Sequence, residues 1–380
     1  MTAHPSVAEF RAHFPALADT TYLASCSQGA LSDAMTAALL EFQFSIREHG
    51  APWELWMGKV AEARAGFARH IGADVDEVAV VSTASEGAFH VASTQDWSTR
   101  PRLVTTDMEF PSVAHVWLAQ RPRGAEVVHV PDRDGVVELD DYLALVDERA
   151  ALVSVPLISY RNGLRLPVRE VVARARELGA KTFVDAYQGM GVEPVDVREL
   201  DCDYLVSGSL KYMLGIPGLA FLYVRSGVRD DVAPSLTGWF GRQDPFNFDP
   251  RHLDHPTHAR RFEGGTPSIP SAYGAVAGLS LLEQLDMHRV QQHITELTRS
   301  LQDQLMAAGE VTRSPKDDAL RGPQVALLDA DPHALDAHLK AHSVIGSPRG
   351  DVVRLSFHLY NDDSDVTRAV QAVADYRKTH

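Results

Sequence analysis

Residues 183–189 read FVDAYQG and residues 204–211 read YLVSGSLK, and these two stretches decide the fold. Each has the length and composition of a buried β-strand that runs into a polar turn. The range 167–178 carries apolar residues at helical spacing and follows another apolar run at 151–157. Strand, helix and strand in this order predict a parallel sheet. Such sheets bind ligands beyond the carboxyl ends of their strands, which is where Asp185 and Lys211 stand.

The rest of the chain extends this pattern into an α/β fold. The β-rich runs are 78–81, 102–105, 125–130, 151–157, 182–185, 204–207 and 219–224. A chain of 380 residues favours one large and one smaller domain, and we expect a mostly parallel sheet in a large domain spanning 20–270. After an irregular segment at 250–270, a long helical stretch runs from Ser271 to about Ala308. Strand, helix and strand patterns follow at 325–328, 334–342 and 352–357. These predict a small α+β domain at 271–380, with residues 1–19 as an N-terminal segment that packs on it.

Composition excludes several classes of function. The net charge of −15 disfavours non-specific binding to nucleic acid or to an anionic membrane. Cys26 and Cys202 are the only cysteines, which excludes a disulfide framework and a four-cysteine zinc site. No apolar run approaches the roughly 20 residues that span a bilayer, and residues 1–14 lack the apolar core of a signal peptide. We expect a cytoplasmic protein without a metal site, whose partners are small molecules and copies of itself.

A lysine and a carboxylate at two strand ends fit the needs of pyridoxal 5′-phosphate (PLP). This cofactor forms a Schiff base with a lysine and needs an acid to keep its pyridine nitrogen protonated. The protonated nitrogen would offset the cost of burying Asp185, and partial desolvation would help Lys211 to lose its proton. Taken singly, Asp185 reads as a helix cap and Lys211 as a solvated loop lysine. The pair predicts that both are catalytic.

The range 183–224 resembles the core of the class V aminotransferase family, fold type I PLP enzymes that include cysteine desulfurases and kynureninases. The family's Asp-Ala-x-Gln, Ser-rich lysine turn and Gly-containing loop read here as 185–188, 207–211 and 215–218. By this resemblance Gln188 would hydrogen-bond the phenolic oxygen of the cofactor, and Ser209 would help to bind its phosphate. Both side chains also read as ordinary polar groups of turns. The resemblance covers nearly the whole chain.

Two upstream segments match further parts of the family pattern. Residues 81–88 read VSTASEGA and start a helix directly after a strand, where phosphate binds well. The resemblance assigns Ser85 and Glu86 to the cofactor, although the same pattern also reads as a helix cap. Residues 106–112 read TDMEFPS and resemble the segment that places a ring on PLP. This assigns Phe110 to stacking, where the alternative is a core aromatic.

The expected small domain supplies a candidate for substrate binding. Residues 353–361 read VRLSFHLYN and resemble the carboxylate-binding strand of the family, in its kynureninase form. Arg354 would clamp the substrate carboxylate through two hydrogen bonds, whereas an arginine on a surface strand is the plain alternative. Residues 159–163 read SYRNG, in the place where desulfurases have a cofactor-contacting Asn pair. Tyr160 or Arg161 is therefore assigned to the cofactor or to substrate selection.

The resemblance also implies a homodimer with shared active sites. Residues 238–241 read GWFG, as in kynureninases, and residues 263–267 read EGGTP, as in the wider family. There such residues reach the phosphate of the neighbouring subunit's cofactor. Trp239, Thr266 or both are therefore expected to bind a cofactor across a dimer interface.

One difference from the family pattern reduces the number of reactions that this chain is expected to catalyse. Desulfurases carry a mobile cysteine in the loop that corresponds to residues 342–351, and this chain has none there. We expect a lyase that acts on an amino acid, of kynureninase type or by carbon–sulfur β-elimination. An aminotransferase or an epimerase is the alternative, and a catalytically silent ligand-binding relative is the non-enzyme alternative. A nucleotide-binding protein is set aside, because no Gly-x-Gly-x-x-Gly turn or Walker lysine motif is present.

Overall fold

A computed structural model describes residues 4–228 and 233–379 of the chain. The expected N-terminal segment 1–19, large domain 20–270 and small domain 271–380 therefore include residues 1–3, 229–232 and 380, which lie outside the described residues. Within the described ranges, no helix combines the length and the apolar character needed to cross a membrane.

Seven strands form a central sheet in the order β2-β8-β7-β6-β5-β3-β4. The strands are β2 (Val78–Val81), β3 (Arg102–Thr106), β4 (Glu126–Val130), β5 (Ala150–Pro156), β6 (Lys181–Asp185), β7 (Tyr204–Gly208) and β8 (Ala220–Val224). Neighbouring strands are parallel except for β8, which runs antiparallel to β2 and β7. All seven lie within one residue of the predicted runs at each end. The predicted α/β fold with a mostly parallel sheet is confirmed.

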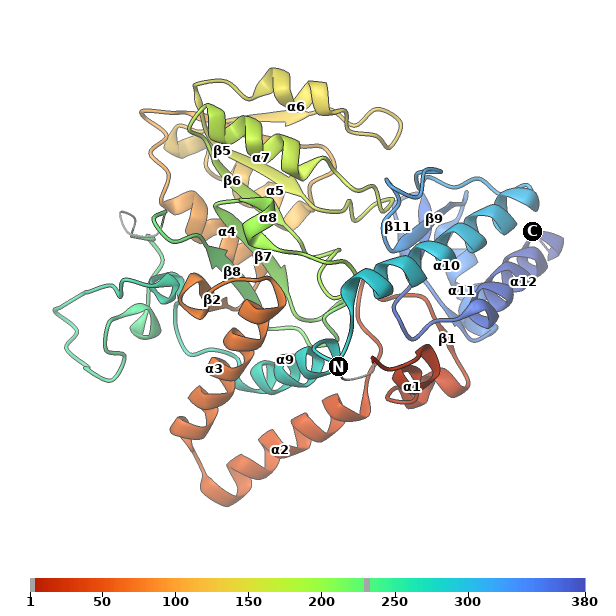
Figure 1. Cartoon of the computed structure of the whole chain (residues 1–380), viewed down its shortest axis with the longest axis horizontal. Helices are drawn as coiled ribbons and strands as arrows, with labels where there is room; N and C mark the ends of the chain where they lie inside the picture. Colours follow the sequence, from red (N-terminus) through yellow and green to blue (C-terminus); the bar gives the residue numbers. More distant parts are fainter. Residues whose placement is uncertain (1–3, 229–232, 380) are drawn as a thin grey trace.

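Helices cover both faces of this sheet (Figure 1). They are α3 (Trp53–His70), α6 (Leu139–Leu145) and α7 (Val168–Glu177) on one face, and α4 (Ala84–Ser93) and α5 (Pro111–Leu118) on the other. Side chains alternate along each strand, so Leu205 of β7 faces the first layer and Val206 faces the second. The Trp117 ring of α5 lies 5.0 Å from the Phe183 ring of β6, edge to face. The sheet is buried on both sides, as a parallel sheet requires.

The C-terminal part forms a smaller α+β unit. Its antiparallel sheet has the order β11-β12-β9, and a two-stranded parallel sheet joins β1 to β10. These strands are β1 (Thr21–Tyr22), β9 (Gln324–Leu328), β10 (Val344–Ile345), β11 (Ser347–Arg349) and β12 (Val352–Ser356). The remaining α-helices are α1 (Val7–Arg11), α2 (Asp33–His49), α8 (Val197–Leu200), α9 (Ile269–Leu282), α10 (Met287–Ala307), α11 (Pro332–Ala341) and α12 (Asp363–Thr379). Short 3₁₀ turns occupy Pro15–Ala18, Val75–Glu77, Arg121–Arg123, Trp239–Gly241 and Ala259–Phe262.

The long helical stretch expected from Ser271 to Ala308 is divided into α9 and α10, so its continuity was wrong. Asp286 caps α10, since its carboxylate accepts hydrogen bonds from the backbone amides of His288 and Arg289. The two helices also pack in different places, because α9 contacts α2 and α3 while α10 contacts β9 and α12. The division of the chain at residue 270 stays a prediction, and the packing of α9 favours a division after this helix.

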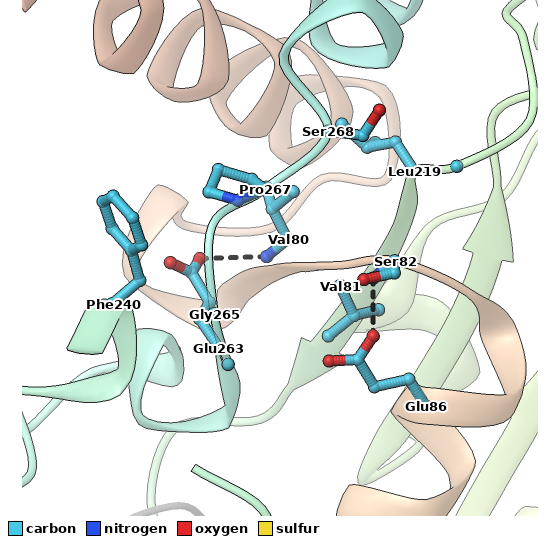
Figure 2. Close-up of a pocket in the computed structure, with 12 residues that line it drawn as sticks. Val80, Val81, Ser82, Glu86, Leu219, Phe240, Glu263, Gly265, Pro267 and Ser268 are labelled. Carbon is cyan, nitrogen blue, oxygen red and sulfur yellow. Dashed lines mark hydrogen bonds between the residues drawn. The ribbon is translucent and has the colours of Figure 1, made fainter. Parts of the chain in front are cut away.

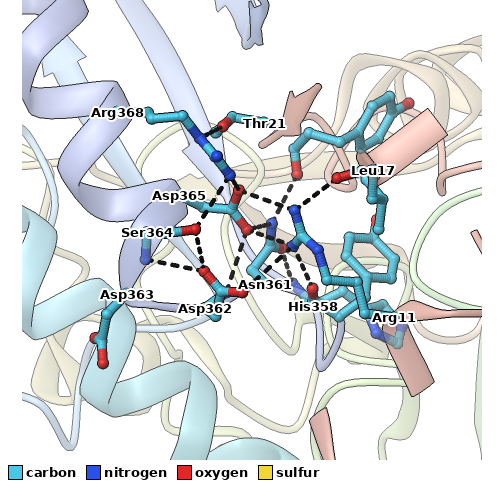
Figure 3. A network of polar contacts seen from close by, with 12 residues as sticks. Arg11, Leu17, Thr21, His358, Asn361, Asp362, Asp363, Ser364, Asp365 and Arg368 are labelled. Atoms are coloured by element: carbon cyan, nitrogen blue, oxygen red, sulfur yellow. Dashed lines mark hydrogen bonds and ion pairs between the residues drawn. The ribbon is translucent and has the colours of Figure 1, made fainter. Parts of the chain in front are cut away.

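A buried ionic network attaches the N-terminal segment to the small domain (Figure 3). The carboxylate of Asp365 is fully buried and accepts hydrogen bonds from Arg11 at 2.7 Å, Arg368 at 2.7 Å and Asn361 at 3.0 Å. Burial by itself would raise the pKa of Asp365, but the hydrogen bonds from Arg11 and its neighbours produce a net lowering. The charged form of Asp365 is therefore stabilised in the folded protein.

We predict that Asp365→Asn lowers the free energy of unfolding by about 3 kcal/mol or more, because it leaves two arginines without their shared partner. Urea denaturation at a series of pH values measures this. Since the pKa of Asp365 is lowered on folding, the stability difference should be full near neutral pH and vanish as the pH falls through that lowered pKa. Asp363→Asn, at an exposed position on the same helix, should cost less than about 1 kcal/mol. Equal stability of Asp365→Asn and the unmodified protein would refute the role of the network.

Candidate active site

Four adjacent strands end at one edge of the sheet, and the loops after them meet there. Asp185 is the last residue of β6, and Lys211 follows β7 by three residues. Phe110 follows β3 by four residues, and Tyr160 follows β5 by four. Together with Gln188, these residues line one small cavity. The parallel order β7-β6-β5-β3 thus brings together residues that lie up to 101 positions apart in the chain.

Lys211 stands in aromatic surroundings. Its Nζ atom lies 4.2 Å from the centre of the Tyr187 ring and 5.2 Å from that of Phe110. Burial lowers the pKa of Lys211 to about 8, against the opposing effect of the nearby Asp185 carboxylate. Near neutral pH a larger fraction of this amine is therefore unprotonated than in a lysine exposed to water. An amine in this state can attack a carbonyl carbon.

Asp185 is buried beside this amine, with 6% of its surface exposed. Its Oδ1 atom accepts a hydrogen bond from the backbone amide of Tyr187 at 2.9 Å. Burial raises the pKa of Asp185, while this amide and the charge of Lys211 act in the other direction. A protonated ring nitrogen placed against the carboxylate would stabilise its charged form.

Gln188 carries an unsatisfied polar atom in the same cavity. Its Nε2 atom donates to the carbonyl oxygen of Cys26 at 3.2 Å, and its Oε1 atom is buried with no hydrogen-bond partner. A buried polar atom without a partner is costly in the free protein. The side chain therefore suits a ligand that brings a polar group, as the phenolic oxygen of PLP would.

The start of α4 provides a site for an anion. Thr83 is the N-cap and accepts the backbone N–H of Glu86, so Ser85 lies inside the first turn. In the part of the chain that the structure describes, the hydroxyl of Ser85 forms no hydrogen bond. The carboxylate of Glu86 accepts from the backbone N–H of Ser82 at 2.8 Å (Figure 2). It also lies 3.6 Å from the ring of His90. The hydroxyl of Ser85 and the backbone amides of this turn suit a phosphate. The backbone N–H and the carboxylate of Glu86 already form hydrogen bonds to Thr83 and Ser82.

The small cavity at Lys211 is not lined by Ser209, Trp239 or Thr266. The hydroxyl of Ser209 donates to the carbonyl oxygen of Ile216 at 3.0 Å and so closes its own loop. The turn that contains Thr266 borders the start of α4, as the positions of Gly265 and Pro267 near Ser82 and Glu86 show (Figure 2). Trp239 packs in an aromatic cluster instead, with its ring centre 5.8 Å from that of Trp53 and 6.1 Å from that of Phe248. The assignments of all three to the cofactor stay predictions.

Arg354 lies on β12, facing the sheet edge from the small domain. Only 1% of its surface is exposed, and it donates hydrogen bonds to the carbonyl oxygen of Tyr160 at 3.0 Å and to the hydroxyl of Ser347 at 2.7 Å. No carboxylate among residues 4–228 and 233–379 forms an ion pair with it. A buried guanidinium without a counter-charge is costly. Its remaining N–H groups suit a carboxylate ligand.

The two candidates in the loop after β5 take different positions. The Tyr160 ring meets the Phe110 ring edge to face at 5.0 Å and lines the small cavity. Arg161 lies outside it, 3.2 Å from Asp132 in an ion pair at the wall of a neighbouring, larger cavity. Tyr160 is therefore placed to touch a cofactor or substrate held by Lys211, and Arg161 is placed further out.

Glu109 is a buried acid whose role the sequence did not reveal. Its carboxylate accepts from the hydroxyl of Ser154 at 2.7 Å and from the backbone N–H of Phe110 at 3.0 Å. Burial, and then the negative charge of Asp185, raise the pKa of Glu109 to about 8. The acidic residue between Met108 and Phe110 was visible in the sequence, but its burial beside Asp185 depends on the pairing of strands distant in the chain. Glu109 fixes the backbone at Phe110 and stays mostly protonated at neutral pH.

We predict that Glu109→Gln removes part of the pH dependence of stability. In the unmodified protein, Glu109 keeps its proton in the folded state up to about pH 8 but loses it in the unfolded state near its ordinary pKa of 4.5. Stability should therefore fall as the pH rises between these values, and the loss should be smaller in Glu109→Gln by at least about 1 kcal/mol. Urea denaturation at pH 5 and at pH 8 measures the difference. Parallel pH profiles of the two proteins would show that Glu109 does not ionise in this range.

Comparison with known proteins places the whole chain among related sequences. The family model "Aminotransferase class-V" matches residues 45–369. An uncharacterized aminotransferase of Bacillus subtilis, YcbU, is 35% identical over 368 residues, which is 96% of this chain and 97% of that protein. A kynureninase of Bacillus thuringiensis is 28% identical over 401 aligned positions, covering 99% of this chain and 92% of the relative.

Solved structures share the fold over the full chain. The apo structure of a cysteine desulfurase from Thermococcus onnurineus NA1 has a TM-score of 0.90, with 24% identity and complete coverage of both chains. A complex of the cystine C–S lyase C-DES with its product cysteine persulfide has a TM-score of 0.86, with 20% identity over 95% of this chain and 99% of that chain. At these identities the structures establish the shared fold.

Proposed function

The chain belongs to the class V aminotransferase family and is a PLP-dependent enzyme, and on this premise we propose that it is a lyase that acts on an amino acid. The observation that carries the proposal is Arg354, a buried guanidinium without a counter-charge among the described residues, whose hydrogen-bond partner Tyr160 lines the cavity with Lys211. An amino acid supplies both groups that this arrangement requires, an amine to replace that of Lys211 and a carboxylate for Arg354.

The residues around Lys211 fit PLP as a group. Lys211 would hold the aldehyde carbon, Asp185 would pair with the ring nitrogen, and Gln188 would meet the phenolic oxygen. Phe110 would lie against the ring, and Ser85 with the amides at the start of α4 would bind the phosphate. The support for this assignment is the set of unsatisfied groups at these positions, the orphan Oε1 atom of Gln188 and the free hydroxyl of Ser85.

The chain's own groups divide the work of the reaction. When bound, PLP supplies an electron-accepting ring that stabilises negative charge at the α-carbon of the substrate. Arg354 holds the substrate carboxylate and thereby fixes which bond at the α-carbon is broken. Lys211, with its lowered pKa, takes the α-proton at Nζ and returns it later. Asp185 would hold a protonated ring nitrogen, and the nearby buried Glu109 remains neutral near pH 7 and adds no second negative charge.

Two reactions remain candidates at this site. Similarity to kynureninases along nearly the whole chain favours cleavage or elimination at the substrate side chain, so a lyase is the first candidate. Similarity to a protein named as an aminotransferase favours amine transfer as the second. A desulfurase of the usual kind is disfavoured, since residues 342–351 contain no cysteine.

We predict that the purified protein absorbs visible light with PLP bound and that L-amino acids alter this absorbance. A lyase returns to the starting spectrum as a cleaved product accumulates, while an aminotransferase leaves the cofactor in its amine form until a keto acid is added. Lys211→Ala should lose the absorbance of lysine-bound cofactor and turnover, because the variant lacks the amine that forms the Schiff base and moves the α-proton. Circular dichroism checks that the variant folds. Normal turnover by Lys211→Ala would refute the lysine assignment.

We further propose a cytoplasmic homodimer with shared active sites. The described surface around Trp239 carries exposed apolar side chains, among them Phe246 and Phe248, the latter with 74% of its surface exposed. Such a contiguous apolar cluster is expected to be covered by a partner. A second copy of the chain would bury it and would bring Trp239 or Thr266 to the phosphate of the partner's cofactor.

We predict that Phe248→Asp weakens this dimer, because it introduces a charge into the apolar contact. Light scattering coupled to size-exclusion chromatography should give twice the chain mass for the unmodified protein and a larger monomer fraction for the variant. Val311→Asp, at an exposed apolar position on the small domain, is the matched control and should remain dimeric. A monomeric unmodified protein at micromolar concentration would overturn the proposal.

A further inference from the structure

A second cavity lies next to the site of Lys211, between the two domains. Its volume is about 460 Å³, within the range of small-molecule sites. Met108 and Tyr160 line both this cavity and the small cavity at Lys211, so the two are neighbours that share walls. A substrate held at Lys211 and Arg354 therefore has room for its side chain in the larger cavity.

The walls of this cavity carry three arginines, and their charges are not equally balanced. Arg161 lies 3.2 Å from Asp132, and Arg313 lies 3.2 Å from Asp351. For Arg349, no ion pair or hydrogen bond of the side chain is found within residues 4–228 and 233–379. Arg349 is therefore the arginine of this wall whose charge remains free for a ligand.

The hairpin of β11 and β12 aims Arg349 at the active site. Ser347 pairs with Arg354 across the two strands, and its hydroxyl accepts a hydrogen bond from the Arg354 guanidinium. Alternate residues of a strand project from the same face, so Arg349 lies on the face that Ser347 and Arg354 share. Two residues along a strand correspond to roughly 7 Å. Both arginines also affect the pKa of Lys211. Burial is the main cause of its lowering, Asp185 and Cys26 oppose it, and the positive charges of Arg354 and Arg349 add smaller contributions in the same direction as burial.

We propose that Arg349 binds an acidic group at the end of the substrate side chain, so that the substrate is an amino acid with a side-chain carboxylate. This inference rests on the proposed function. Arg354 binds the α-carboxylate, and Arg349 binds the second carboxylate in the larger cavity. The carboxylates of Asp132 and Asp351 are held by the neighbouring arginines, whereas Asp134 lines the same cavity and forms no ion pair with Arg349 among the described residues. Arg349 is thus a specificity-determining residue.

The test measures binding through the absorbance of bound PLP, without reliance on turnover. The full-length protein loaded with PLP is titrated with L-glutamate and L-glutamine, with L-aspartate and L-asparagine, and with L-kynurenine. We expect at least one acid to bind about tenfold or more tightly than its amide. In Arg349→Gln this preference should fall to about twofold or less. Arg169→Gln, on the outer surface of α7 and paired with Glu199, controls for net charge and should keep the preference.

The possible results distinguish a failure of the Arg349 assignment from a failure of the proposed lyase function. Binding of the amides or of kynurenine at least as tightly as the acids would overturn the role of Arg349 and leave the proposed function intact. Retention of the acid preference in Arg349→Gln would overturn it as well. If none of these five amino acids changes the absorbance, this inference fails, and the proposed function fails with it only if other L-amino acids also leave the absorbance unchanged.

Discussion

The parallel pairing of β6 with β7 is the contact on which the active site depends. Its register places Asp185 opposite Val206, and the turn after β7 brings Lys211 to the cavity that Asp185 also lines. The adjacent pairing of β5 sets Pro156 opposite Asp185 and delivers Tyr160 to the same edge. A shift of one residue in either pairing would turn the carboxylate toward a helical layer. The buried apolar faces on both sides of the sheet prevent that shift.

Charge balance explains why the site needs ligands to be complete. Two basic groups, Lys211 and Arg354, are buried at this site, where burial raises the pKa of Asp185 and Glu109 keeps its proton near neutral pH. A phosphate at α4, a protonated ring nitrogen and a substrate carboxylate each compensate a group that the described protein leaves unsatisfied. Ligand binding is thus favoured, because the polar groups of the site are already ordered and desolvated before the ligand arrives.

Much of this arrangement could be predicted from the sequence, because it follows from local patterns. The seven strands of the large sheet were predicted to within a residue, since buried parallel strands are continuous apolar runs. The break between α9 and α10 was missed, because helical spacing continues through it and the cap at Asp286 is a single residue. Glu109 and Arg349 were missed for a different reason. Their environment comes from segments far away in the chain, and no local pattern reports burial beside another carboxylate or the lack of a partner.

The small domain is built from both ends of the chain. β1, near the N-terminus, pairs with β10, and Arg11 is held by Asp365 near the C-terminus. On the ribosome, the first twenty or so residues emerge long before α12 is made, so they remain without their partners while the sheet of the large domain assembles. β12, which carries Arg354, is also made late, after all seven strands of the large sheet. Synthesis from the N-terminus therefore completes the strands that lead to Asp185 and Lys211 before β12 and Arg354 are made, so the place for the substrate carboxylate is added after the lysine and its acid.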